Sequence, residues 1–196
     1  MVRKITKYKI IELFLNDYSK KFYLREIAHL MEFAHQTIKP YVEELVKEQI
    51  LIKNQRKNIT EYGLNFQSQK IWDYLVIAEK EKLMKRLDSE SLLKILFEKL
   101  SNSFINNTFL VFGSSAEKIK KGSDIDFLIV GKSDLNKTLS EFEEIYNKKI
   151  HKIQVNSLNN LSPTLTKEIY KKHLILNNTE QIINFFRELY EKNKLV

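Results

Sequence analysis

Two carboxylates stand at the start of an apolar run in the second half of the chain. Asp124 and Asp126 flank Ile125, and the run Ile125–Val130 has the composition of a buried strand. Because side chains alternate along a strand, the two carboxylates would point to one face, about 6.5–7 Å apart. Carboxylates this close repel each other, and burying them without a partner is costly. A divalent cation removes both problems, and Mg²⁺ held by carboxylates keeps waters and substrate phosphates as its other ligands.

A glycine-serine motif precedes this pair and suggests a place for those phosphates. Gly113-Ser114 follows an apolar strand predicted at Thr108–Phe112, and a short helix is predicted to begin at Ser114. The first amides of a helix lack intrahelical acceptors and favour an anion. The order therefore predicts an anion site beside a metal site. Alternatively, Ser114 and Glu117 form a capping box, and Ser114 only caps its own helix.

The stretch FGSSAEKIKKGSDIDFLIV resembles the signature of the DNA polymerase beta nucleotidyltransferase superfamily, in its small minimal-nucleotidyltransferase branch. The resemblance extends over residues 92–180 and includes the later KEIYKKHLIL. It implies that the two aspartates are catalytic and bind Mg²⁺ together with a nucleoside triphosphate, usually ATP. The residues that it implies for nucleotide binding are Gly113, Ser114, Ser115, Asp124 and Asp126.

The third carboxylate that this superfamily usually carries on its next central strand is missing here. That strand is predicted at Ile150–Ser157, and its sequence, IHKIQVNS, contains no Asp or Glu. Its alternation predicts Lys152 or Gln154 opposite the aspartates and His151 on the apolar face, as a packed side chain. Because the third acid commonly activates the attacking hydroxyl, we expect slow transfer with nucleotide binding retained. The alternatives are that His151 is the base, that a partner supplies the acid, or that the domain is inactive.

The N-terminal region has the element order of a winged helix. Helical periodicity appears in ITKYKIIELFLND, in YLREIAHLMEF and from Gln36 onward, with Pro40 expected in the first turn of the last helix. Two β-prone runs, Ile50–Lys53 and Ile59–Tyr62, then flank a basic turn and predict a hairpin. The stretch YLREIAHLMEFAHQTIKPYVEELVKEQILIK, followed by NITEYGLN, resembles archaeal and bacterial winged-helix regulators.

That second resemblance implies contacts with duplex DNA. In such domains the second helix of the motif enters the major groove, and the hairpin reaches the backbone or the minor groove. The nucleic-acid-binding residues expected here are Gln36, Thr37, Lys39, Lys53, Arg56 and Lys57. Residues 1–87 hold 17 Lys and Arg against 11 Asp and Glu, an excess that suits a polyanion. Alternatively, these charges are only solvated, and the domain docks on a protein.

The 196 residues accommodate two small domains of α/β (α+β) class. We expect a winged helix-turn-helix domain at 1–65, a linker helix at 66–90, and a nucleotidyltransferase domain at 91–196. In the last, a short mixed sheet would be flanked by helices, with strands at Thr108–Phe112, Ile125–Val130 and Ile150–Ser157 and a helical pair at the C-terminus. The lack of cysteine excludes disulfides and thiolate metal sites.

The function expected from the sequence is Mg²⁺-dependent nucleotidyl transfer from ATP or another nucleoside triphosphate, with a winged-helix module for nucleic-acid binding or targeting. The acceptor stays open, and a partner protein is one candidate. The alternatives are a DNA-binding regulator whose nucleotidyltransferase domain senses nucleotide, and an antitoxin that modifies a partner. No apolar run is long enough for a membrane span, and the start lacks the apolar core of a signal peptide, so we expect a cytoplasmic protein. A homodimer is left open.

Overall fold

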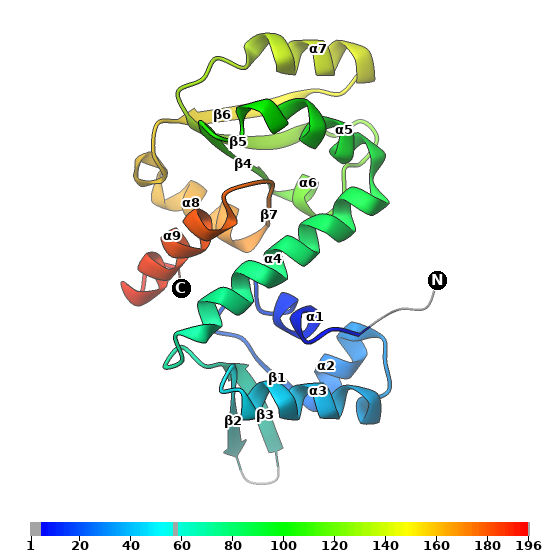
Figure 1. Ribbon diagram of the computed structural model, residues 1–196, viewed down its shortest axis with the longest axis vertical. Helices are drawn as coiled ribbons and strands as arrows, with labels where there is room; N and C mark the ends of the chain where they lie inside the picture. Colours follow the sequence, from blue (N-terminus) through cyan, green and yellow to red (C-terminus); the bar gives the residue numbers. More distant parts are fainter. Residues whose placement is uncertain (1–4, 57–58, 196) are drawn as a thin grey trace. The chain divides into compact units, whose positions relative to one another are not determined.

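The structure is a computed structural model that describes residues 5–56 and 59–195 (Figure 1). Lys57, one of the expected wing residues, lies outside the described residues, and Arg56 is described only by its backbone. The chain forms two compact units, Met1–Glu81 and Lys82–Leu195, and the division falls inside helix α4 (Lys70–Ser89). The domain limits expected from the sequence stay predictions.

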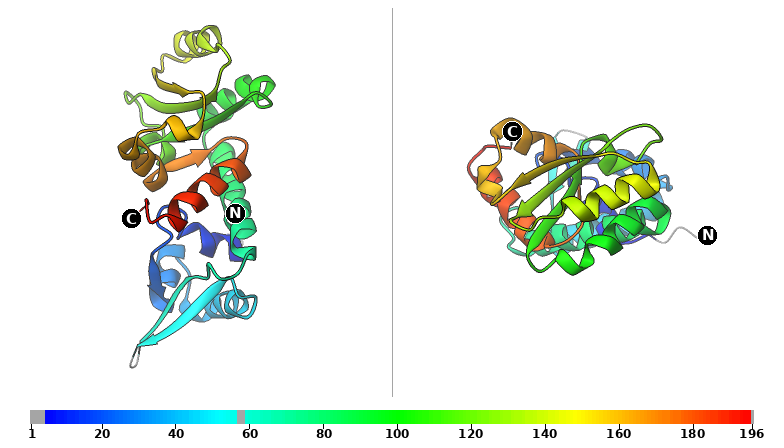
Figure 2. Two further views of the ribbon diagram at one scale, coloured as in Figure 1. Left: turned by 90° about the vertical axis from the view of Figure 1, so that its left-hand side faces the viewer. Right: turned by 90° about the horizontal axis from the view of Figure 1, so that it is seen from above.

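The N-terminal unit combines helices with a small antiparallel sheet. Its elements are α1 (Lys7–Glu12), β1 (Lys21–Tyr23), α2 (Leu24–Met31), α3 (His35–Lys47), β2 (Leu51–Arg56), β3 (Ile59–Leu64) and the first part of α4. The sheet order is β1-β3-β2, and Figure 2 shows β2 and β3 as a hairpin. The expected helices and hairpin are therefore present, whereas the three-residue strand β1 was not expected.

Helix α3 differs from the expectation in one respect. It begins at His35, so Pro40 is its sixth residue and lies in the second turn instead of the first. Because proline has no amide hydrogen, the carbonyl of Gln36 loses its helical donor there. The buried face of the helix, Ile38, Val42 and Leu45, still follows the predicted periodicity.

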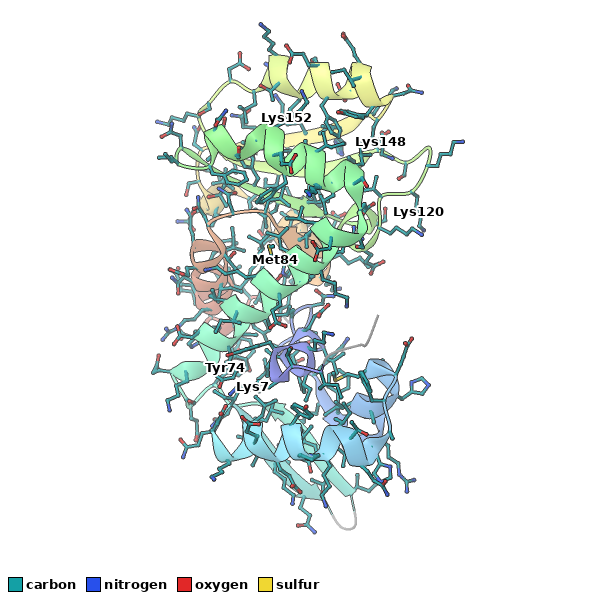
Figure 3. The ribbon with its side chains drawn as sticks, turned by 45° about the vertical axis from the view of Figure 1, so that its right-hand side comes forward. Lys7, Tyr74, Met84, Lys120, Lys148 and Lys152 are labelled. Atoms are coloured by element: carbon teal, nitrogen blue, oxygen red, sulfur yellow. The ribbon has the colours of Figure 1, made fainter. Side chains whose placement is uncertain are left out.

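A polar cluster fixes α1 to α3 and α4 within this unit. The Lys7 ammonium donates to both carboxylate oxygens of Glu48, at 2.8 and 3.0 Å, and the Tyr74 hydroxyl donates to Glu48 Oε2 at 2.5 Å. Figure 3 labels Lys7 and Tyr74, and the ammonium lies 5.3 Å from the centre of the tyrosine ring. The hydrogen bond with Glu48 raises the pKa of Lys7, and the same bond lowers the pKa of Glu48.

The C-terminal unit contains a four-stranded mixed sheet. Its elements after α4 are α5 (Ser91–Leu100), β4 (Asn107–Phe112), α6 (Ser114–Glu117), β5 (Ile125–Gly131), α7 (Asn136–Tyr146), β6 (Ile150–Val155), α8 (Pro163–Lys171), β7 (His173–Ile175) and α9 (Thr179–Glu191), with 3₁₀ turns at Ser101–Ser103 and Leu158–Asn160. The sheet order is β6-β5-β4-β7. The β5–β6 pair is parallel, and both pairs made by β4 are antiparallel. The mixed sheet is as expected, whereas β7 was not.

The two faces of this sheet have different surroundings. On one face, Phe109, Val111, Phe127 and Ile129 are fully buried against α5 and α7, and Figure 2 shows α7 lying along the sheet. On the other face, Thr108 of β4 bonds to Gln181 of α9 at 2.7 Å, so α9 covers the β4 side. Asp126 lies on this second face because it follows the buried Ile125 by one residue. None of the described helices combines the length and the apolar composition that a membrane span requires.

Candidate nucleotide and metal site

The turn at Gly113 brings the glycine-serine motif next to one of the two aspartates. Gly113 has φ 63° and ψ −147°, a backbone region that is essentially restricted to glycine. A Cβ atom at this position would lie 2.9 Å from Oδ2 of Asp126. The position therefore requires glycine for two reasons: its backbone dihedral angles, and the close approach of the Asp126 carboxylate.

The helix after this turn is shorter than a typical anion-binding helix. Gly113 is the N-cap of α6, and Ser114 is its first residue, so the alternative that Ser114 caps the helix is wrong. Helix α6 has only four residues, which leaves a small dipole. The Gly113 amide donates to the Lys172 carbonyl at 3.0 Å. The amides of Ser114 and Ser115, which by helix geometry have no intrahelical acceptor, are the groups that could hold an anion.

Ser115 has a structural contact as well. Its side chain is buried, and Oγ donates to the Asp124 backbone carbonyl at 2.9 Å. The hydroxyl therefore braces the segment that leads into β5. Any contact with a nucleotide would come from the Ser115 amide.

The two aspartates differ in their local structure. Strand β5 begins at Ile125, as the sequence predicts, so Asp124 directly precedes the strand and Asp126 is its second residue. Both carboxylates are accessible: Asp124 is exposed, and the Asp126 side chain is 32% exposed. Throughout residues 5–56 and 59–195, no hydrogen bond or ion pair is found at the Asp124 carboxylate. Strand alternation places Asp126 on the face opposite the buried Ile125, and the exposed Asp124 stands at the start of the same strand.

The residue opposite Asp126 is His151, which corrects the expectation for β6. In the parallel register Asp126 pairs with His151, and Phe127 pairs with Lys152. Paired residues share a face, so His151 lies beside Asp126, with Nδ1 3.2 Å from Oδ1. The His151 side chain is 62% exposed and not packed in the core as expected.

Lys152 and Gln154, which were expected opposite the aspartates, contact other partners. The Lys152 ammonium donates to Asn136 Oδ1 at 2.5 Å, and the Gln154 amide donates to the carbonyls of Gly131 and Ser133 at 3.1 Å. The error arose because the β5–β6 register cannot be read from the alternation of one strand. Among the described residues, no group of three His, Asp or Glu side chains is placed to hold a metal.

The expected nucleic-acid contacts lie in the other unit. Gln36, Thr37 and Lys39 are exposed on the first turns of α3, and Lys39 is 3.7 Å from Glu43. Lys53 is exposed on β2, where it pairs with Tyr62 of β3. In this structure, the side chains of Gln36, Thr37 and Lys39 on α3 are therefore accessible to a partner.

A comparison with protein families supports the resemblance seen in the motif. Residues 96–181 match the family model described as polymerase beta, nucleotidyltransferase. This segment includes Gly113 and both aspartates and lies inside the C-terminal unit. The match supports a nucleotidyltransferase domain of this superfamily and suggests nucleotidyl transfer in general. No curated protein and no solved structure gave a significant match.

Proposed function

We propose that this chain is a Mg²⁺-dependent nucleotidyltransferase that uses ATP or another nucleoside triphosphate as donor. The observation that carries the proposal is the Asp126 carboxylate against the Gly113 turn, with the exposed Asp124 two residues earlier in the chain. The donor set fits the metal, because Mg²⁺ prefers carboxylate oxygens and keeps open positions for waters and phosphates. When bound, Mg²⁺ would neutralise charge on the triphosphate.

Each of the chain's own groups then has a defined task. Asp124 and Asp126 hold the cation through accessible carboxylates, and the amides of Ser114 and Ser115 can donate to a phosphate oxygen. Gly113 allows the carboxylate and the phosphate-facing turn to lie next to each other. This arrangement orients the donor for attack by an acceptor hydroxyl, whose identity is open.

We expect isothermal titration to show ATP binding that requires Mg²⁺. The double variant Asp124→Asn with Asp126→Asn should lose the Mg²⁺-dependent part, because amides keep the shape of the site but cannot neutralise the cation. The matched control, Glu141→Gln with Glu144→Gln, removes two exposed carboxylates of α7 and should bind ATP as the wild type does. Equal ATP affinity in the aspartate variant would overturn the metal-site proposal.

The acceptor can be sought separately from binding. Labelled ATP with Mg²⁺ and cell extract would show which species gains the label. A labelled protein would favour a partner-modifying role, such as that of an antitoxin, and a labelled RNA would favour transfer to a nucleic-acid end.

A second candidate function is that of a nucleotide-sensing regulator. It is favoured by His151, which stands beside Asp126 where the superfamily usually has a third carboxylate. A sensor would bind Mg²⁺ and ATP without releasing pyrophosphate, whereas an enzyme would release it when the acceptor is present.

We infer that the N-terminal unit is a winged-helix module that binds duplex DNA. The order α1, α2, α3 and hairpin, with a three-stranded sheet, supports this inference. So do the exposed residues Gln36, Thr37 and Lys39 at the start of α3. A role in docking on a protein is the competing interpretation.

Removing the basic hairpin residues should weaken DNA binding and its dependence on salt. The variant carries Lys53→Ala, Arg56→Ala and Lys57→Ala, and the slope of log K against log salt should become shallower by about 0.9 for each phosphate that is no longer neutralised. The control removes three exposed lysines of the C-terminal unit by Lys94→Ala, Lys132→Ala and Lys137→Ala. An unchanged slope in the hairpin variant, or no binding of the wild type to duplex DNA at low salt, would favour protein docking.

A further inference from the structure

A buried lysine holds the loop that carries Asp124. Lys148 follows α7 and is only 7% exposed, although lysine is rarely buried. Its ammonium donates to the Lys120 carbonyl at 2.6 Å and to the Ser123 carbonyl, with Ser123 Oγ at 3.5 Å. Figure 3 labels Lys148 and Lys120 on neighbouring segments. Lys120 and Ser123 both belong to the loop between α6 and β5.

The burial of this charge requires compensation from the loop. An ammonium has three donors, and removing it from water is costly unless those donors are bonded. Both carbonyl acceptors lie in the loop, so the ammonium is satisfied only when the loop has this conformation. The lysine and the loop therefore order each other.

The contact reaches Asp124 through its backbone. The Ser123 carbonyl accepts from Lys148, the Asp124 carbonyl accepts from Ser115 Oγ, and the Ile125 amide donates to the Lys149 carbonyl at 2.9 Å. The two peptide groups on either side of Asp124 are thus fixed by three hydrogen bonds, while its carboxylate stays exposed. Two of these bonds come from the adjacent residues Lys148 and Lys149.

We propose that Lys148 is a positioning residue for the metal ligand Asp124. The inference rests on the proposed function, because it gives a role to Asp124 as a metal ligand. Lys148 directs its ammonium to the backbone carbonyls of Lys120 and Ser123, so it acts by fixing the loop from which the carboxylate projects. Removal of groups that orient metal ligands typically lowers metal affinity by about 10–100-fold.

Removing Lys148 should change the affinity for a divalent cation in opposite directions, depending on whether the lysine positions Asp124 or acts only through its charge. A nearby ammonium repels a divalent cation, so removing it would strengthen metal binding if Lys148 acted only through its charge. If Lys148 positions Asp124, its removal weakens metal binding despite the lower repulsion. Mn²⁺ alone is therefore the right probe, since ATP would reverse the sign of the charge effect.

The experiment measures Mn²⁺ binding by water-proton relaxation in the full-length protein. Lys148→Met keeps most of the length of the side chain and removes its donors, and we expect Mn²⁺ affinity to fall by about 10–100-fold. Lys148→Arg keeps both charge and donors and should recover part of that affinity. Lys152→Met is the charge-matched control, because its ammonium bonds Asn136 on the opposite face. Asn177→Ala is the control for reduced stability, since Asn177 bonds Phe109 and Asn107 away from this loop.

The outcomes distinguish this inference from the proposed function. If the wild type binds no Mn²⁺ in the absence of nucleotide, the positioning role is refuted, whereas the proposed function is decided by the Mg²⁺-dependent titration with ATP. If the wild type binds and Lys148→Met binds equally well or more tightly, only the positioning role is refuted. A similar decrease in Asn177→Ala would also refute it, because general destabilisation would then explain the effect. Should Lys148→Met fail to fold, Lys148→Leu, which also lacks donors, takes its place with the same expectation, and wild-type Mn²⁺ affinity in that variant overturns the inference.

Discussion

Gly113→Ala is expected to abolish Mg²⁺-dependent ATP binding. The new Cβ would lie 2.9 Å from Oδ2 of Asp126, so the carboxylate must move or the turn must open. The backbone dihedral angles add a cost of about 1–3 kcal/mol for a residue other than glycine. Titration with ATP would measure the loss of binding, and thermal unfolding would measure the loss of stability.

Gly131→Ala provides the control for backbone strain. Gly131 also has a positive φ, 152°, and a Cβ there would overlap Asn107 Oδ1, at the opposite end of β5 from Asp126. We expect this variant to lose stability and to keep ATP binding. If the two alanine variants bind ATP equally, the close approach of Asp126 to the turn is not what makes Gly113 necessary.

His151→Asp is expected to raise nucleotidyl transfer. The substitution would place a carboxylate next to Asp126, on the same face and in the paired position of the neighbouring strand. An acid there could accept the proton of the attacking hydroxyl, and general-base catalysis typically contributes about 10²–10⁴-fold. The measurement is Mg²⁺-dependent release of pyrophosphate from ATP in an extract that contains the acceptor.

Two aspartate substitutions on the other face of β6 serve as controls. Lys152→Asp and Gln154→Asp place the same carboxylate on the same strand, but at positions whose present side chains bond Asn136 and Ser133. Neither should raise the rate. A gain in either of them without a gain in His151→Asp would contradict the register, and a loss in His151→Asp would identify the imidazole as the working base.

The local parts of the candidate site could be predicted from the sequence, because their spacing lies within one segment of chain. Gly113 is the turn after β4, and Asp124 and Asp126 stand at the start of β5. The chain between them is short, so local geometry relates the turn to the two carboxylates. Short strands were missed for the opposite reason. β1 and β7 have three residues each and exist through pairing with β3 and β4, which a local pattern does not contain.

The errors at β6 and α3 have a similar origin. His151 carries no sign in its own strand that it faces Asp126, because that placement depends on the pairing of two strands. In the sequence, Lys148 is one lysine in a polar stretch, and nothing near it indicates burial. Only the folded loop shows that its side chain is buried. Steric grounds predict Pro40 in a first turn, yet the helix begins earlier and tolerates the missing hydrogen bond.

The connection between α7 and β6 has a consequence for how this chain can diverge in evolution. It consists of three residues, 147–149, and the hydrogen bond from the Ile125 amide to the Lys149 carbonyl sets where β6 begins to pair. A slip of one residue turns every side chain of a strand to the opposite face. Deleting one residue here would bring Lys152 to the place of His151 and put an ammonium beside Asp126. The length of this connection therefore carries functional information, although none of its residues belongs to a recognisable motif.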